Sequence, residues 1–188
     1  DMTHKPGCIL RLYHAAFQQF CAADDALQRC FDSIATLGKT NYEVLLIDDG
    51  SQDATVALLD EWKRKGFLEW YTSDNLGPGK SFMHLLETAQ PGNYYAFCDQ
   101  DDVWIPNKLS MTMEKMKAVE QANPGKPVIV HTDMNIVDEK LDVIHESFWR
   151  SSGLRPDVLR TFPYLCTCNS VNGCTILMNS IARELILE

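Results

Sequence analysis

Residues 43–51 read Glu-Val-Leu-Leu-Ile-Asp-Asp-Gly-Ser, a short apolar run that ends in two carboxylates and a turn. Four consecutive apolar residues bounded by turn residues are typical of a strand that is buried on both faces. Beyond the turn, Val56, Leu59 and Trp62 recur three residues apart, which predicts a helix that ends by Gly66. This part of the chain is therefore expected to form a strand, a turn and a helix.

The same order of strand, loop and helix recurs further along the chain, and such alternation implies parallel strands joined by right-handed helical crossovers. Residues 67–72 predict a strand, 75–79 a loop, 80–89 a helix and 94–98 a third strand, followed by a helix after Pro106. Later strands are expected at 128–131, at the sheet edge over 141–144 and at 170–178, with a last helix from Ser180. The sequence thus predicts an α/β fold with a mostly parallel sheet flanked by helices.

The size of the chain favours one domain over residues 1–188, because 188 residues with 45% hydrophobic content are enough for a single core. Residues 1–26 are atypical of the pattern. Between Cys8 and Cys21 there is neither strand alternation nor a helical stripe, so no element is predicted there.

The charge balance argues against nucleic-acid binding, because 17 basic and 26 acidic residues give a net charge of -9. An acidic protein that handles phosphates is expected to use a cation. No apolar run approaches the roughly 18 residues of a membrane span, and no secretory leader is recognisable, so a cytoplasmic chain is expected. The seven cysteines are odd in number and scattered, which predicts reduced thiols and, without Cys-x-x-Cys spacing, no zinc site.

Two acidic clusters, Asp48-Asp49 and Asp99-Gln100-Asp101-Asp102, come at the ends of predicted strands. Ligands of open α/β sheets bind outside the carboxyl ends of the strands, so both clusters should face one crevice. Carboxylates packed together disfavour one another's ionisation unless a divalent cation compensates them. A tight loop of this kind suits Mg²⁺ or Mn²⁺, which can bridge a diphosphate, and this predicts displacement of a nucleoside diphosphate.

Residues 47–53 (Ile-Asp-Asp-Gly-Ser-Gln-Asp) and 99–109 (Asp-Gln-Asp-Asp-Val-Trp-Ile-Pro-Asn-Lys-Leu) together resemble family 2 glycosyltransferases, and more narrowly bacterial rhamnosyltransferase-like members. The resemblance spans about Leu27 to Glu188 and includes Asn75-Leu76-Gly77, His131-Thr132-Asp133 and Val171-Asn172-Gly173-Cys174-Thr175. It implies a GT-A fold and transfer of a sugar, with inversion, from a nucleoside-diphosphate donor to a saccharide or lipid-linked saccharide acceptor. It also implies cell-surface polysaccharide synthesis, in the cytoplasm or at the inner face of the membrane.

The resemblance also implies roles for individual residues. Asp49 would contact the nucleotide base, while Asp99, Asp101 and Asp102 would share the ribose and metal contacts, the direct metal ligands being left open. Candidate contacts to the nucleotide sugar also include Asp48, Asn75 and Lys80. For Asn75 and Lys80, turn and helix-start chemistry is the alternative explanation.

The general base of similar inverting enzymes follows the last strand and helix seen here, so the base and the acceptor part are expected beyond Glu188. Within the chain, Asp133 is the internal carboxylate nominated as catalytic, and the alternative is that it bonds its own backbone. The family usually opens with an apolar strand ending in a motif like Thr-Tyr-Asn, whereas residues 9–14 read Ile-Leu-Arg-Leu-Tyr-His, so the nucleotide pocket is expected to be incomplete there.

Two other functions stay open. A nucleotidyltransferase also combines an α/β sheet with acidic metal ligands, but it would normally need a glycine-rich, basic triphosphate loop, which is absent from the sequence. A non-catalytic module that binds nucleotide sugars is the other alternative, and binding without turnover would favour it.

Overall fold

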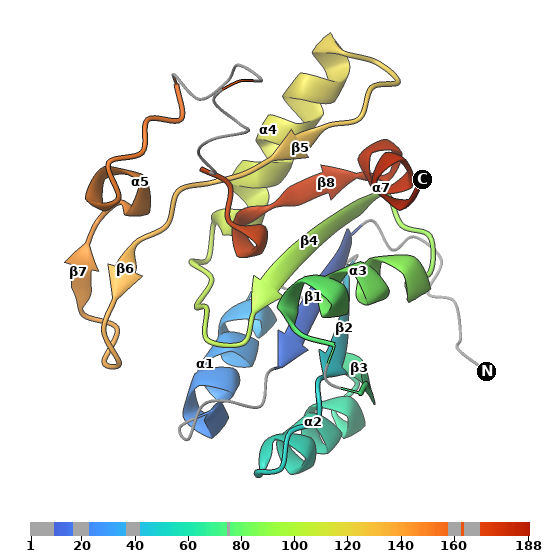
Figure 1. The fold of residues 1–188 in the computed structure, drawn as a ribbon, viewed down its shortest axis with the longest axis vertical. Helices are drawn as coiled ribbons and strands as arrows, with labels where there is room; N and C mark the ends of the chain where they lie inside the picture. The colour runs from blue at the N-terminus through green and yellow to red at the C-terminus, as the bar shows by residue number, and fades with distance from the viewer. Residues whose placement is uncertain (1–9, 17–22, 37–41, 75, 158–162, 164–169) are drawn as a thin grey trace.

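The computed structural model describes residues 10–16, 23–36, 42–74, 76–157, 163 and 170–188. Its centre is a six-stranded sheet with the order β3-β2-β1-β4-β8-β5 (Figure 1). Four neighbouring strands are parallel: β3 (Leu68–Thr72), β2 (Tyr42–Asp48), β1 (Leu10–Ala16) and β4 (Tyr94–Asp99). β8 (Leu177–Asn179) is antiparallel to both of its neighbours, β4 and β5 (Ile129–Val130). The predicted α/β fold with a mostly parallel sheet is confirmed.

β1 is the main addition to what the sequence predicts. No element is expected between Cys8 and Cys21, yet β1 lies in the middle of the sheet, with Leu10 aligned with Tyr42 of β2 on one side and with Tyr94 of β4 on the other. A strand between two parallel neighbours pairs its backbone groups on both edges, and this stabilises it whatever its side-chain pattern. The sequence pattern leaves this segment without an assignment, and the structure adds the central strand.

Helices cover both faces of the sheet. One core lies under α1 (Ala23–Ala35), α2 (Thr55–Arg64) and α4 (Lys108–Ala122), and the other lies under α3 (Pro78–Thr88) and α7 (Ser180–Leu187). Leu46 of β2 belongs to the first core and Ile47 to the second, as expected for a strand that is buried on both faces. Among the described residues, no helix combines the length and apolar character that crossing a bilayer requires.

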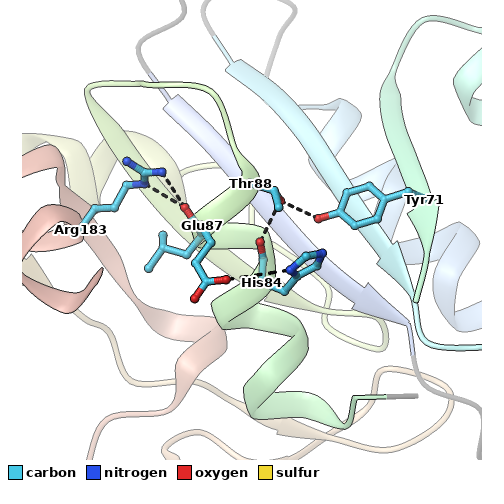
Figure 2. A network of polar contacts seen from close by, with 6 residues as sticks. Tyr71, His84, Glu87, Thr88 and Arg183 are labelled. Atoms are coloured by element: carbon cyan, nitrogen blue, oxygen red, sulfur yellow. Dashed lines mark hydrogen bonds and ion pairs between the residues drawn. The ribbon is translucent and has the colours of Figure 1, made fainter. Parts of the chain in front are cut away.

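The end of α3 is held from two sides (Figure 2). Arg183 of α7 donates hydrogen bonds to the carbonyl of Leu86 at 2.7 and 3.0 Å and to that of Ala89 at 3.3 Å. From β3, the hydroxyl of Tyr71 lies 2.8 Å from that of Thr88. The last carbonyls of a helix have no partner within the helix, so the guanidinium satisfies groups that would otherwise be unpaired. These contacts fix the position of α3 on the sheet.

Two segments differ from the predicted strands. Residues 141–144 do not extend the main sheet, because β7 (Val143–His145) pairs with β6 (Ile136–Val137) in a separate two-stranded sheet. Asp138 closes the turn between them, since its carboxylate accepts the backbone N–H groups of residues 140 and 142. Of the strand predicted at 170–178, only β8 forms, after a 3₁₀ turn, η1 (Gly173–Thr175).

Candidate active site

The strand register brings the two acidic clusters to one edge of the sheet. Asp48 is aligned with Ala16 of β1, and Asp99 is aligned with the preceding residue, Ala15. The two acidic strand ends are therefore separated by a single strand, or about 10 Å between backbones. The prediction that both clusters lie at one carboxyl edge is confirmed.

Asp48 shapes the turn that follows β2. Its side chain is 1% exposed, and its carboxylate accepts hydrogen bonds from the N–H of Ser51 at 3.1 and 3.3 Å and from the Ser51 hydroxyl. Gly50 between them has a φ of 92°, which favours glycine. The Asp48 carboxylate thus accepts its hydrogen bonds from within the turn itself.

Asp49 joins the end of β2 to the loop that precedes α3. Its Oδ1 accepts the Ser73 hydroxyl at 2.6 Å and the Leu76 N–H at 2.7 Å, and its Oδ2 accepts the Gly77 N–H at 2.8 Å. Burial acts to raise the pKa of Asp49, but these hydrogen bonds together bring it below its ordinary value. Asp49 is therefore a charged group that fixes the shape of this loop.

The two other candidates near this loop are Asn75 and Lys80. Asn75 lies outside the described residues. Lys80 is exposed on the first turn of α3, directly after the loop that Asp49 fixes. A helix N-terminus attracts anions, so the place is consistent with a diphosphate contact, which stays a prediction.

The carboxylates of Asp99 and Asp102 lie at the two ends of the turn after β4, where the Asp102 N–H donates to the Asp99 carbonyl at 3.2 Å. Both are partly buried, whereas Asp101 is exposed. Burial and the charges of Asp102 and Asp101 raise the pKa of Asp99 to about 6, and burial raises the pKa of Asp102 as well. Hydrogen bonds with the Cys174 side chain offset only part of this rise in pKa at both carboxyls, so the negative charge that most needs compensation is at Asp99 and Asp102.

A cysteine and a lysine that the sequence reasoning gave no role complete the surroundings of this pair. The Cys174 sulfur and one oxygen each of Asp99 and Asp102 all lie within 4.8 Å of one another. Lys108 donates from Nζ to the Cys174 carbonyl at 3.0 Å and lies 4.1 Å from the ring centroid of Trp104. Lys108 lies within the motif at 99–109 and Cys174 lies within the segment 171–175, both of which belong to the family resemblance, so the resemblance was the signal that could have found them.

The residues at this turn fit a hard divalent cation. The two carboxylates offer oxygen ligands, which Mg²⁺ and Mn²⁺ prefer. Between them, Gln100 has a buried Oε1 without a hydrogen-bond partner among the described residues. An unpaired buried acceptor costs stability, and this one lies in the same turn as the carboxylate pair.

Asp133 accepts three hydrogen bonds. Its Oδ1 accepts the Met134 N–H at 2.9 Å and the Trp149 N–H at 3.2 Å, and its Oδ2 accepts the Ser147 hydroxyl at 2.6 Å. It thereby anchors the start of the short helix α5 (Phe148–Ser151). Its bond to the neighbouring Met134 N–H is of the local backbone kind that the sequence offered as the alternative to catalysis. Its role as a catalytic base stays a prediction.

The fold of this chain is similar to that of solved enzyme structures. Glucosyl-3-phosphoglycerate synthase from Mycobacterium tuberculosis superposes with a TM-score of 0.58 at 18% identity, over 95% of this chain and 58% of that chain. This likeness shows the fold, which is GT-A as predicted.

Residues 19–181 match the glycosyl transferase family 2, and the chain belongs to that family. An uncharacterized glycosyltransferase of Rickettsia typhi is 25% identical over 95% of this chain and 52% of its own length. The poly(ribitol-phosphate) beta-glucosyltransferase of Bacillus spizizenii is 27% identical over 63% of this chain and 22% of its own length. The chain thus spans about half of the first relative and about a fifth of the second.

Proposed function

We propose that this chain is the donor-binding domain of a glycosyltransferase that moves a sugar from a nucleoside diphosphate to a hydroxyl acceptor. The acceptor is a saccharide or lipid-linked saccharide, the ion is Mg²⁺ or Mn²⁺, and the product belongs to cell-surface polysaccharide synthesis. The observation that carries the proposal is the carboxylate pair Asp99 and Asp102 at the carboxyl edge of a family 2 sheet. The M. tuberculosis synthase of similar fold was crystallised with Mn²⁺ and uridine diphosphate, which supports this choice of ligands.

The donor would lie along the carboxyl edge of the sheet, between the loop after β2 and the turn after β4. In this arrangement Asp49 and the loop it fixes receive the nucleotide, and Lys80 at the start of α3 faces the diphosphate. Asp99 and Asp102 hold the ion, and the exposed Asp101 is available to the ribose. A divalent ion held there offsets the charge that builds on the diphosphate as it leaves.

In the proposed reaction, an acceptor hydroxyl attacks the anomeric carbon opposite the diphosphate. A glycosidic bond forms, the bond to the diphosphate oxygen breaks, and the configuration at the anomeric carbon inverts. The hydroxyl proton passes to a carboxylate, for which Asp133 is the candidate within this chain. Its hydrogen bonds from Ser147 and Trp149 would hold it in one orientation.

Two donor sugars deserve direct comparison. The motifs at 47–53 and 99–109 resemble rhamnosyltransferase-like members and favour rhamnose, whereas the B. spizizenii relative is named for glucose transfer. Incubation with nucleotide-linked rhamnose and glucose, each with a hydroxyl acceptor, tests the choice by analysis of the sugar product.

Calorimetric titration of uridine diphosphate, with Mn²⁺ and with excess chelator, tests the metal-dependent donor site. We expect at least tenfold weaker binding in chelator, because the diphosphate would otherwise approach Asp99 and Asp102 uncompensated. Asp102→Asn should weaken Mn²⁺-dependent binding by a similar factor. Glu114→Gln removes one exposed charge from α4 and serves as the matched control, with affinity unchanged within twofold. Equal affinity with and without chelator would refute the metal site.

Product analysis separates this function from the alternatives. A glycosyltransferase releases a nucleoside diphosphate from a labelled nucleotide sugar, whereas a nucleotidyltransferase releases pyrophosphate from a nucleoside triphosphate. Release of pyrophosphate, or donor binding without any transfer in a chain extended to the length of the relatives, would contradict the proposed activity.

A further inference from the structure

The metal site proposed above has an unusual neighbour, the thiol of Cys174. Asp99 and Asp102 come from the turn after β4, whereas Cys174 comes from η1, far along the chain. One donor atom from each residue lies within 4.8 Å of the other two. Three potential ligands from two distant segments therefore converge on one point.

The spacing of these atoms is close to what one ion requires. Metal–oxygen bonds of about 2.1 Å and metal–sulfur bonds of about 2.3 Å place three ligands of one ion about 3–4 Å apart in each pair. Atoms that lie up to 4.8 Å apart reach one ion when each moves by roughly half an ångström or slightly more. Small side-chain rotations cover such a distance.

The backbone that carries the sulfur is held in place. Lys108 donates to the Cys174 carbonyl at 3.0 Å, while its ammonium group packs on the ring of Trp104. On the other side, Thr175 donates from its hydroxyl and its N–H to the Asn172 carbonyl, at 2.7 and 3.0 Å. Cys174 is only 6% exposed, so its sulfur stays beside the carboxylates instead of pointing into water.

We propose that Cys174 is a third donor at the Asp99–Asp102 site and makes it selective for divalent ions that bind sulfur readily, such as Zn²⁺ and Co²⁺, over Mg²⁺. Sulfur is a soft ligand that hard Mg²⁺ does not favour, so with Mg²⁺ the two carboxylates act alone. When Zn²⁺ or Co²⁺ binds, the S–H bond breaks, a sulfur–metal bond forms and the proton leaves to solvent, with no change of oxidation state. This inference rests on the proposed metal site and concerns which ion the site prefers.

The test is a titration of Co²⁺ into the reduced 188-residue chain, followed by the sulfur-to-cobalt charge-transfer absorption in the near ultraviolet. We expect the band to saturate at one equivalent in the wild type and to be lost in Cys174→Ser, with affinity reduced at least tenfold. Serine keeps a hydrogen-bond donor of similar size. The matched control is Cys98→Ala, which removes another buried thiol, on β4, whose sulfur lies 3.6 Å from that of Cys30. This variant should keep the band.

The possible outcomes separate this inference from the proposed function. If Co²⁺ and Mn²⁺ both bind but the wild type shows no sulfur band, or Cys174→Ser keeps it, the role of Cys174 is wrong while the metal site stands. If neither ion binds with uridine diphosphate present, the metal site itself fails. Should Cys174→Ser not fold, Cys174→Ala provides the second test, because a band retained in that variant places the sulfur donor elsewhere and overturns the inference.

Discussion

Replacing Asp99 with asparagine should make the fold more stable at pH 8 while removing the metal-binding function. In the native chain, burial and the neighbouring Asp102 and Asp101 raise the pKa of Asp99 to about 6, whereas an unfolded aspartate has a pKa near 3.9. As the pH rises from about 4 to 6, the unfolded chain releases this proton first, so the stability of the native state falls. Above pH 6 the full loss of native-state stability persists, whereas a neutral asparagine at this position causes no such loss.

The size of the gain follows from the change in pKa. Each pH unit corresponds to about 1.4 kcal/mol, so a rise of about two pH units gives about 3 kcal/mol. Asp99 is only partly buried, and water screens its neighbours' charges, which reduces the expected gain to about 2 kcal/mol. For a chain of 188 residues this corresponds to a rise of about 5 °C in Tm.

Urea unfolding followed by tryptophan fluorescence, with chelator present, measures the difference at pH 8 and at pH 4. We expect about 2 kcal/mol at pH 8 and no more than about 0.5 kcal/mol at pH 4, where the native carboxyl is protonated and the unfolded one is about half protonated. Asp101→Asn removes the same charge from an exposed position and should change stability by less than about 0.5 kcal/mol. Mn²⁺ at 100 times its Kd should add about 2.7 kcal/mol to the wild type and little to the variant. A variant that is less stable at pH 8, or equally stabilised at pH 4, would refute this reasoning.

Three further predictions concern stability and the loop at the site. Asn179→Ala should lower the free energy of unfolding by about 3 kcal/mol in urea, because this buried amide makes four hydrogen bonds that join α4, α7 and the segment before β5. The control Asn123→Ala, at an exposed amide, should lower it by less than about 0.5 kcal/mol. Arg183→Met should lower the free energy of unfolding by about 1–2 kcal/mol and speed amide hydrogen exchange in the last turn of α3 but not in α2. Exchange in α3 at the wild-type rate would contradict the role of Arg183 in holding the end of this helix. Asp49→Asn should lower the free energy of unfolding by about 2 kcal/mol at pH 7 and weaken uridine diphosphate binding. Because the native pKa of Asp49 is lowered, the difference in unfolding free energy between wild type and variant should shrink as the pH falls below about 4.

The parts of the fold that could be predicted from the sequence depend on local information. The apolar runs at 43–48 and 94–98 correspond closely to β2 (Tyr42–Asp48) and β4 (Tyr94–Asp99), because four or more apolar residues in succession leave a clear pattern. The acidic clusters follow those runs directly, so their meeting at one edge follows from parallel pairing alone. For the same reason, the donor side of the candidate site could be inferred before the structure was known.

The parts that could not be predicted depend on contacts between distant segments. β1 contains Arg11 and His14 within seven residues, and its strand form comes from pairing with β2 and β4 on both sides. Cys174 reaches the acidic turn only because β8 inserts beside β4. The terminal helix α7 also differs from its sequence pattern. Helical spacing predicts that Leu185 faces the core, whereas this residue is 59% exposed.

β8 is synthesised long after β4, the strand with which it pairs. β4 leaves the ribosome well before β8, and at about 5–20 residues per second the interval lasts roughly 4–16 s. During that time the nascent sheet presents one side of β4 as an open edge, which is a template for pairing with another chain. When β8 inserts, it closes that edge and delivers Cys174 to the carboxylate pair in the same step. Protection from aggregation and completion of the ion-binding centre are therefore expected to arise together, after the four parallel strands have paired.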